Sequence, residues 1–219
     1  MAKPQIASID PLKLRENAYL ALRDAFTRGE FAPGDVVSLR DLATQLGISM
    51  TPVREAVRRL VTEGALVDTP SRKLMVPAFD PDRMDELKSA RLALEPLILT
   101  LAMDRMTPQD IDRLEALLDT ATPRPDGMPD LSRNYDFHFT LYRLSGSTVL
   151  LPLVEGLWLQ YGAYLNLIIR QAEAPKVEEH VFHRAIVAAL RAGDHAAARA
   201  ALTDDIKRSF HILRSEHEP

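Results

Sequence analysis

The clearest hydrophobic pattern in the chain lies between residues 38 and 67. Apolar residues recur there at intervals of three and four, the spacing that places them on one face of an α-helix. Gly47 suits the left-handed residue that ends a helix, and Pro52 suits the first turn of the next one. The pattern predicts a helix-turn-helix, whose second helix enters the major groove of DNA. The two apolar stripes consist of Leu39, Leu42, Ala43 and Leu46, and of Val53, Ala56, Val57 and Leu60.

Flanking patterns complete a small N-terminal domain around this helix pair. Apolar residues at helical spacing predict a first helix over residues 12–28, which a glycine and a Pro-Gly turn then end. Residues 66–76 predict two short strands, which form a wing. We therefore expect a flexible arm over residues 1–11 and a winged helix-turn-helix domain over residues 12–78.

Every pattern after residue 79 is helical. The spacing of apolar residues, prolines and glycines predicts six helices, over residues 82–106, 107–121, 130–144, 148–171, 177–192 and 194–215. Six such helices make an antiparallel bundle with its own core. The predicted fold is therefore mainly α, with an N-terminal winged helix-turn-helix, a small β wing, and a C-terminal helical bundle over residues 79–219.

The composition predicts the cellular compartment and shows how charge is distributed between the two domains. The chain has 219 residues, no cysteine and no apolar run long enough to span a membrane. We therefore expect a cytoplasmic protein without disulfides, thiolate metal sites or a membrane partner. The net charge is −4, but residues 1–78 carry 11 Lys and Arg against 9 Asp and Glu. Only the N-terminal domain therefore offers a surface suited to nucleic acid.

The residues of the helix pair add a family resemblance. Residues 39–67, LRDLATQLGISMTPVREAVRRLVTEGALV, and the preceding GEFAPGDVVS resemble the winged helix-turn-helix of GntR-family transcription regulators. The resemblance implies that the chain binds double-stranded DNA through Arg40, Ser49, Met50, Thr51, Arg54, Arg58, Arg72 and Lys73. From the pattern alone, a solvated basic face on an ordinary helical hairpin fits equally well.

Two departures from that family pattern affect the DNA-binding surface. The family usually has Arg at the position of Met50, and a missing arginine–guanine contact forfeits about 1–3 kcal/mol of base discrimination. The wing turn has Pro70 and no glycine. Arg72 and Lys73 at the tip of the wing either contact phosphate or form a solvated turn. DNA binding remains the expectation, while the operator sequence becomes less predictable.

The C-terminal half carries a second resemblance. Its motifs resemble, in order and spacing, those of the FCD ligand-binding domain in the FadR branch of GntR regulators. The resemblance implies a domain that binds an effector, and we also expect it to form the homodimer. The motifs are Arg91-Leu92-Ala93-Leu94-Glu95, Phe137–Tyr142 followed by Ser145-Gly146, and His183–Ile186 followed by Gly193-Asp194.

Four residues of this half correspond, with two changes, to the ligands of metal-binding FCD domains. His138 and His183 stand at the positions of two histidines, Asn134 stands where an aspartate is expected, and Asp205 replaces a third histidine. Such nitrogen and oxygen ligands suit a divalent metal such as Zn²⁺ or Ni²⁺. The alternative is that the two histidines are buried and hydrogen-bonded without a metal. His180 lies one turn from His183, and we expect it to be exposed.

Arg91 and Tyr161 are the candidate effector-binding residues. An arginine among the apolar residues of a helix suits the carboxylate of a small organic acid, which it can hold through two parallel hydrogen bonds. In related FCD domains an arginine in this place is associated with effector carboxylates. The alternatives are a structural salt bridge for Arg91 and a place in the apolar core for Tyr161.

We therefore expect a ligand-responsive transcriptional regulator without catalytic residues. It would act as a homodimer on an operator with two-fold symmetry, and effector and metal would shift the population between arrangements of the two DNA-binding domains. One alternative is a helical-bundle metalloenzyme, but a di-iron site requires paired Glu-x-x-His motifs on facing helices, and the chain lacks such a pair. The other alternative is a DNA-binding protein that responds to no effector.

Overall fold

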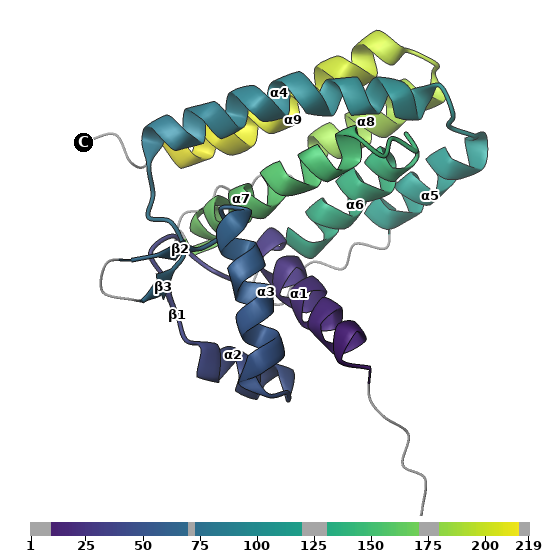
Figure 1. Cartoon of the computed structure of the whole chain (residues 1–219). Coiled ribbons are helices and arrows are strands. Elements are labelled where there is room, and N and C mark those ends of the chain that lie inside the picture. Colours follow the sequence, from purple (N-terminus) through teal and green to yellow (C-terminus); the bar gives the residue numbers. More distant parts are fainter. Residues whose placement is uncertain (1–9, 70–72, 120–130, 171–179, 215–219) are drawn as a thin grey trace, which may run out of the picture.

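The computed structural model describes residues 10–69, 73–119, 131–170 and 180–214, which form an N-terminal domain and a helical bundle (Figure 1). The N-terminal elements are α1 (Pro11–Thr27), β1 (Val36–Val37), α2 (Leu39–Leu46), α3 (Met50–Thr62), β2 (Val67–Asp68) and β3 (Leu74–Met75). The bundle elements are α4 (Pro81–Met103), α5 (Pro108–Asp119), α6 (Leu131–Arg143), α7 (Leu150–Arg170), α8 (Val181–Arg191) and α9 (His195–Arg214). The predicted fold, mainly α with a small β wing, is confirmed.

The turn between α2 and α3 follows the sequence signals that predict it. Ser38 precedes α2, and its side-chain oxygen accepts a hydrogen bond from the backbone N–H of Asp41 at 3.3 Å. Gly47 follows α2 with a φ of 65°, a left-handed conformation that a residue without Cβ adopts at low cost. The apolar stripes of α2 and α3 meet α1 in one core, where Val53 and Leu60 have no exposed surface.

A three-stranded antiparallel sheet closes the N-terminal domain. The strand order is β1-β3-β2, and Val36 and Val67 both pair with Met75. The strands β2 and β3 lie in the predicted wing region. The sequence does not predict β1, because two valines beside a Pro-Gly turn are too short to show a strand pattern. The tip of the wing, residues 70–72, lies outside the described residues.

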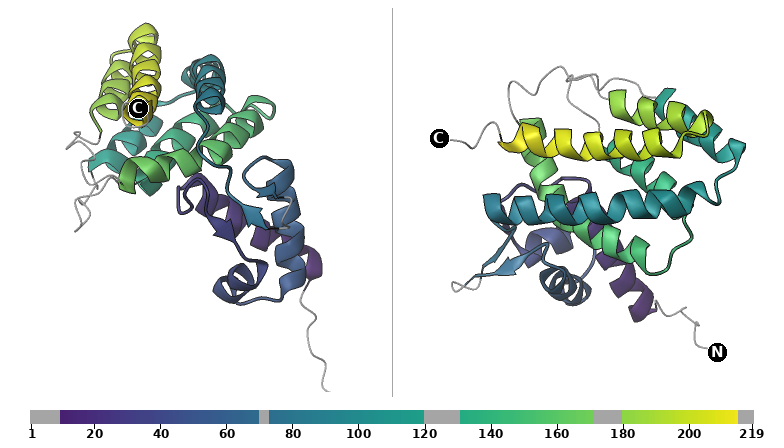
Figure 2. Two further views of the ribbon diagram at one scale, coloured as in Figure 1. Left: turned by 90° about the vertical axis from the view of Figure 1, so that its left-hand side faces the viewer. Right: turned by 90° about the horizontal axis from the view of Figure 1, so that it is seen from above.

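The six predicted helices of the C-terminal half are present as α4 to α9 and enclose a second apolar core. The helices α4 and α9 lie side by side, and α7 lies between α4 and the N-terminal domain (Figure 2). Along α7, Val154 and Trp158 have no exposed surface, so this helix lies at the centre of the bundle core. Within the described ranges, no helix combines the length and the apolar character that a membrane span requires.

The two domains share part of their cores at α7. Leu159 and Ala163 of this helix belong to the apolar cluster of the N-terminal domain, whereas Trp158 belongs to the cluster of the bundle. The backbone that ends α1 approaches α7 so closely that a Cβ at Gly162 would overlap the carbonyl oxygen of Phe26. One helix therefore contributes to the packing of both domains.

Polar contacts strengthen this junction. Arg23 of α1 lies 2.7 Å from Glu155 of α7, and Arg28, directly after α1, lies 3.0 Å from Asp136 of α6. The buried side-chain amide of Asn166 donates a hydrogen bond to the backbone carbonyl of the residue after Arg28. These bonds and the apolar contact together stabilise the orientation that the N-terminal domain has on the bundle in this structure.

The close approach at Gly162 predicts opposite effects for two glycine substitutions in α7. Gly162→Ala should lower the melting temperature, because the added methyl group overlaps backbone and overpacking costs about 1–3 kcal/mol. Gly156→Ala is the matched control, since a Cβ there has no atom within 4 Å, and alanine favours a helix interior by up to about 1 kcal/mol. Thermal unfolding measures both variants. Equal stability of the two would show that the domains are not packed this closely.

Candidate functional site

The first candidate site is the exposed face of α2 and α3. The side chains of Arg40, Ser49, Met50, Thr51, Arg54, Arg58 and Lys73 are exposed, as a DNA-binding role requires, and Arg72 lies outside the described residues. The helix α2 and the N-terminal end of α3 lie far from the bundle (Figure 1). Arg58 forms an ion pair with Glu55 at 2.9 Å, whereas Arg40 and Arg54 form none with any described residue. A helix that enters the major groove by its N-terminus would bring Arg54 to the base edges.

The second candidate site is a buried cluster of two imidazoles and one carboxylate. His138 of α6, His183 of α8 and Asp205 of α9 offer ligand atoms that all lie within 4.8 Å of one another. Nε2 of His138 lies 3.2 Å from Oδ2 of Asp205 and 3.2 Å from Nε2 of His183, and these two atoms lie 3.8 Å apart. With these separations a single point lies about 2 Å from all three atoms, the usual distance from Zn²⁺ to nitrogen and oxygen ligands. The fold thus brings together three of the four predicted metal ligands.

A hydrogen-bond chain orients the first imidazole of this cluster. The hydroxyl of Tyr142 donates to Glu95 at 2.6 Å, so its oxygen is left to accept from Nδ1 of His138 at 3.1 Å. A proton is therefore assigned to Nδ1 of His138, and Nε2 faces Asp205. Nε2 of His183 faces the same point. Arg208 already lies 3.2 Å from the other oxygen of Asp205 and balances the carboxylate charge. A metal ion or a proton between the two nitrogens and the carboxylate would remove the remaining repulsion among their lone pairs.

The protonation states of the cluster suit metal binding. Burial lowers the pKa of His183 to about 3, so this imidazole is neutral near pH 7. Burial alone would raise the pKa of Asp205, but the net shift is downward, and the guanidinium of Arg208 lies 3.2 Å from its carboxylate, so the carboxyl group is ionised. Neutral imidazole and ionised carboxylate are the forms in which these groups ligate metals.

The remaining residues near the cluster come from the same two helices as the histidines. Asn134, the fourth predicted ligand, is partly buried one turn before His138, and residues four apart share one face of a helix. The expectation that His180 is exposed is wrong. His180 is partly buried because its ring stacks on His183, with the two Nδ1 atoms 3.1 Å apart.

Arg91 lies in a second buried network that is joined to the cluster. Its side chain is 2% exposed and forms an ion pair with Glu95, one turn later on α4, at 2.5 and 3.2 Å. Glu95 also accepts hydrogen bonds from Tyr142 at 2.6 Å and from the indole of Trp158 at 3.0 Å. The structural salt bridge considered for Arg91 is therefore present, and Tyr142 connects it to His138.

Arg91 and Tyr161 nevertheless retain hydrogen-bonding capacity. The guanidinium carbon of Arg91 lies 4.2 Å from the ring centroid of Tyr161 and 4.5 Å from that of Trp158. Nη1 of Arg91 and the hydroxyl of Tyr161 are buried without a well-formed hydrogen bond to any described residue. Burial raises the pKa of Tyr161, and Arg91 and Ser209 lie close enough to its hydroxyl to offset part of that rise. Leaving a buried polar group unsatisfied costs about 1–3 kcal/mol. These two donors therefore mark a place where a polar ligand would be stabilised.

Comparisons with known proteins identify the family of these domains. Residues 14–72 match the bacterial regulatory proteins of the gntR family, and residues 86–208 match the FCD domain. The chain is 30% identical over 200 residues to the HTH-type transcriptional regulator McbR of Escherichia coli (strain K12), with 90% of each chain covered. The chain belongs to the GntR family.

Two further relatives agree with this assignment. The solved structure of E. coli McbR/YncC superposes with a TM-score of 0.84 at 28% identity, covering 97% of this chain and 100% of that chain. An E. coli (strain K12) protein whose name refers to the L-lactate dehydrogenase operon is 29% identical over 190 residues, covering 74% of this chain and 71% of that protein. The GntR-family chain is therefore a transcriptional regulator and not an enzyme.

The sequence alone does not assign roles to Glu95 and Tyr142, although both lie in motifs of the FCD resemblance. The spacing of four residues between Arg91 and Glu95 is a signal for an ion pair on one helix face. No comparable signal exists for Tyr142, whose partner Glu95 is 47 residues away. This GntR regulator therefore holds its histidine cluster through a network that only the fold reveals.

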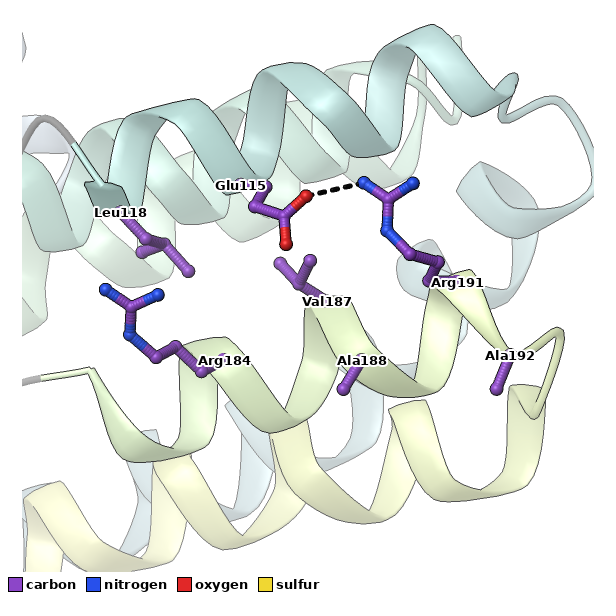
Figure 3. Close-up of a pocket in the computed structure, with 7 residues that line it drawn as sticks. All are labelled: Glu115, Leu118, Arg184, Val187, Ala188, Arg191 and Ala192. Carbon is purple, nitrogen blue, oxygen red and sulfur yellow. Dashed lines mark hydrogen bonds and ion pairs between the residues drawn. The ribbon is translucent and has the colours of Figure 1, made fainter.

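A surface groove between α5 and α8 lies apart from these sites (Figure 3). It encloses about 450 Å³ and has two arginines at its rim. Arg191 is paired with Glu115 at 2.6 Å, and Arg184 is paired with Asp119 at 3.0 Å. Because both cations are already neutralised, the groove offers less to a charged ligand than the buried cluster does.

Proposed function

We propose that this GntR regulator binds a divalent metal in its bundle and responds to a small carboxylate. The observation that carries the proposal is the convergence of His138, His183 and Asp205 within 4.8 Å. Asn134, on the same face of α6 as His138, supplies a neutral oxygen as the fourth ligand. Zn²⁺ and Ni²⁺ accept such mixed ligand sets, and a six-coordinate ion would keep two positions for an effector.

The buried donors beside the cluster support a carboxylate as the effector. Nη1 of Arg91 and the hydroxyl of Tyr161 would donate to carboxylate oxygens, and hydrogen bonds to charged groups contribute about 1.5–3 kcal/mol each. The relative whose name refers to the L-lactate dehydrogenase operon makes L-lactate, a small carboxylate, a reasonable first compound to test. Effector binding would then change the balance between two arrangements of the bundle.

A homodimer is the proposed assembly, because a helix-turn-helix protein reads a two-fold operator as two half-sites. Apolar side chains on α4 and α7 support an interface on the bundle. Arg83 bonds to Gln160, so the two helices are neighbours, and Leu97 of α4 and Leu153 of α7 are about half exposed, at 47% and 51%. Analytical ultracentrifugation tests this assembly, and a monomer at micromolar concentration contradicts it.

The DNA-binding proposal predicts that Arg54→Ala weakens binding to an operator selected from random-sequence duplexes by the wild type. Loss of one specific base contact should cost about 1–3 kcal/mol, a decrease in affinity of about tenfold or more. Arg113→Ala is the matched control, because Arg113 is an exposed arginine on α5, remote from α3. Fluorescence anisotropy measures both affinities, with two chains expected per duplex at saturation. Unchanged affinity for Arg54→Ala would place base recognition elsewhere.

The metal proposal predicts one Zn²⁺ or Ni²⁺ per chain, detectable through Trp158, the single tryptophan of the sequence. Its ring centroid lies 5.1 Å from that of His138, so metal binding should change its fluorescence. His138→Ala should abolish binding, whereas His195→Ala, at an exposed position, should not. Asn134→Asp should bind more tightly, since a charged oxygen replaces a neutral one. A wild type that takes up neither metal after loading contradicts the proposal.

The effector proposal predicts that a panel of small mono- and dicarboxylates contains a compound that raises the melting temperature of the metal-loaded protein. Tyr161→Phe removes one buried donor and should weaken the binding of that compound by about tenfold, a loss of about 1.4 kcal/mol of binding free energy. Tyr164→Phe is the control, because its hydroxyl is also buried without a well-formed hydrogen bond, but Arg91 does not contact its ring. An equal effect of the two variants would argue against a ligand beside Arg91.

A further inference from the structure

We propose that Arg28 transmits metal occupancy of the histidine cluster to the DNA-binding domain, an inference that rests on the metal site proposed above. Arg28 is the residue that directly follows α1, and its contacts with the bundle lie on α6, the helix that carries Asn134 and His138. It acts as a positioning residue, because it touches neither the metal site nor the surface that faces DNA.

Arg28 holds the beginning of α6 through three separate contacts. Its Nη1 donates to the backbone carbonyl of Ser132 at 3.2 Å, and its Nη2 lies 3.0 Å from the carboxylate of Asp136. Its guanidinium carbon lies 4.8 Å from the ring centroid of Tyr135. Its Nε bonds to Asp24 in the last turns of α1, which fixes the side chain on its own helix at 2.8 Å. The planar guanidinium thus joins the end of α1 to the first turns of α6.

The residues that Arg28 contacts alternate along α6 with the proposed metal ligands. Asn134 lies between Ser132 and Tyr135, and His138 lies half a turn beyond Asp136. At about 100° per residue, the contacts of Arg28 and the metal ligands occupy different faces of the same turns. A metal that binds Asn134 and His138 therefore restrains the same turns of α6 that Arg28 contacts on the opposite face of the helix.

From Arg28 the connection continues through α1 to the recognition helix. The hydroxyl of Tyr19 on α1 donates to Glu63, which directly follows α3, at 2.8 Å. The guanidinium carbon of Arg59 on α3 lies 3.5 Å from the ring centroid of Tyr19. Because α1 and α3 also share the apolar core, a displacement of α1 carries α3 with it. Metal binding would thus change the orientation of α3 relative to the bundle.

A neighbouring ion pair provides the comparison that isolates this connection. Arg23 also lies on α1 and also forms an interdomain ion pair, at 2.7 Å. Its partner Glu155 is on α7, whereas the partner of Arg28 is on α6, the helix that carries two of the proposed metal ligands. The two arginines have similar exposure, 24% for Arg23 and 21% for Arg28. Replacing either arginine with alanine therefore removes one interdomain ion pair at similar exposure, whereas only Arg28→Ala loses the hydrogen bond to Ser132 and the ion pair with Asp136 on α6.

The experiment measures the affinity of the full-length protein for a selected operator, with and without Zn²⁺. Protein is freed of metal with a chelator and then titrated with Zn²⁺, while Trp158 fluorescence follows binding in the cluster. For the wild type, Zn²⁺ should change affinity for a selected operator by at least about fivefold, the lower end of typical coupling between sites. Arg28→Ala should keep the Trp158 fluorescence change and the Zn²⁺ concentration at its midpoint. Zn²⁺ should then no longer change the operator affinity of this variant. Arg23→Ala should behave as the wild type.

A second variant tests the same contact from the other helix. Asp136→Asn keeps the size of the side chain but removes its charge, so it should reduce the Zn²⁺-dependent change in operator affinity with little effect on folding. The proposal is overturned if Arg28→Ala and Asp136→Asn respond to Zn²⁺ as the wild type does, or if Arg23→Ala loses the response equally. It is also overturned if Zn²⁺ binds to the wild type without changing operator affinity. Absence of any Trp158 response and of bound Zn²⁺ in the wild type instead refutes the metal site itself.

Discussion

A carboxylate with no exposed surface must have its charge balanced and its oxygens hydrogen-bonded, and Glu95 imposes this requirement on the bundle. Arg91 balances the charge, and Tyr142 and Trp158 complete the hydrogen bonds, so helices α4, α6 and α7 meet at one point. Replacing Arg91 would leave the charge of Glu95 uncompensated in an apolar core, a change that typically costs about 3–5 kcal/mol. The orientation of His138 depends on the same network, because Tyr142 is its hydrogen-bond partner.

Local signals in the sequence were sufficient for the helices, whereas the class of protein came from the resemblance of the motifs to those of a known family. Periodic apolar residues, together with Gly47 at a left-handed turn, define α2 and α3 without reference to the rest of the fold. Prolines and glycines likewise mark the ends of the bundle helices as local signals in the sequence. The metal ligands were expected from a family resemblance, and the convergence of His138, His183 and Asp205 within 4.8 Å agrees with it. The residues expected to contact DNA are exposed, apart from Arg72, which lies outside the described residues.

Contacts between distant segments were not accessible in this way. Glu95 and Trp158 are 63 residues apart, and Arg28 and Asp136 are 108 residues apart, so no periodicity relates them. The strand β1 has two residues and takes its hydrogen-bonding partner from β3, which makes it a product of tertiary structure. His180 was expected at the surface because nothing near it in the sequence reveals that its ring stacks on His183. These features depend on which helices pack together, and helix packing is decided by the whole chain.

The sharing of α7 between two cores bears on how regulators of this architecture can be recombined. The sequence divides near residue 78, where the wing gives way to helices, and a chimera joined there would look like an exchange of two modules. Leu159 and Ala163 complete the core of the domain on the other side of that division. A transplanted DNA-binding domain would therefore meet a surface shaped for a different partner unless the matching face of α7, including Gly162, were transferred with it. For this chain, the residues that complete the N-terminal domain therefore extend into the middle of the helical bundle.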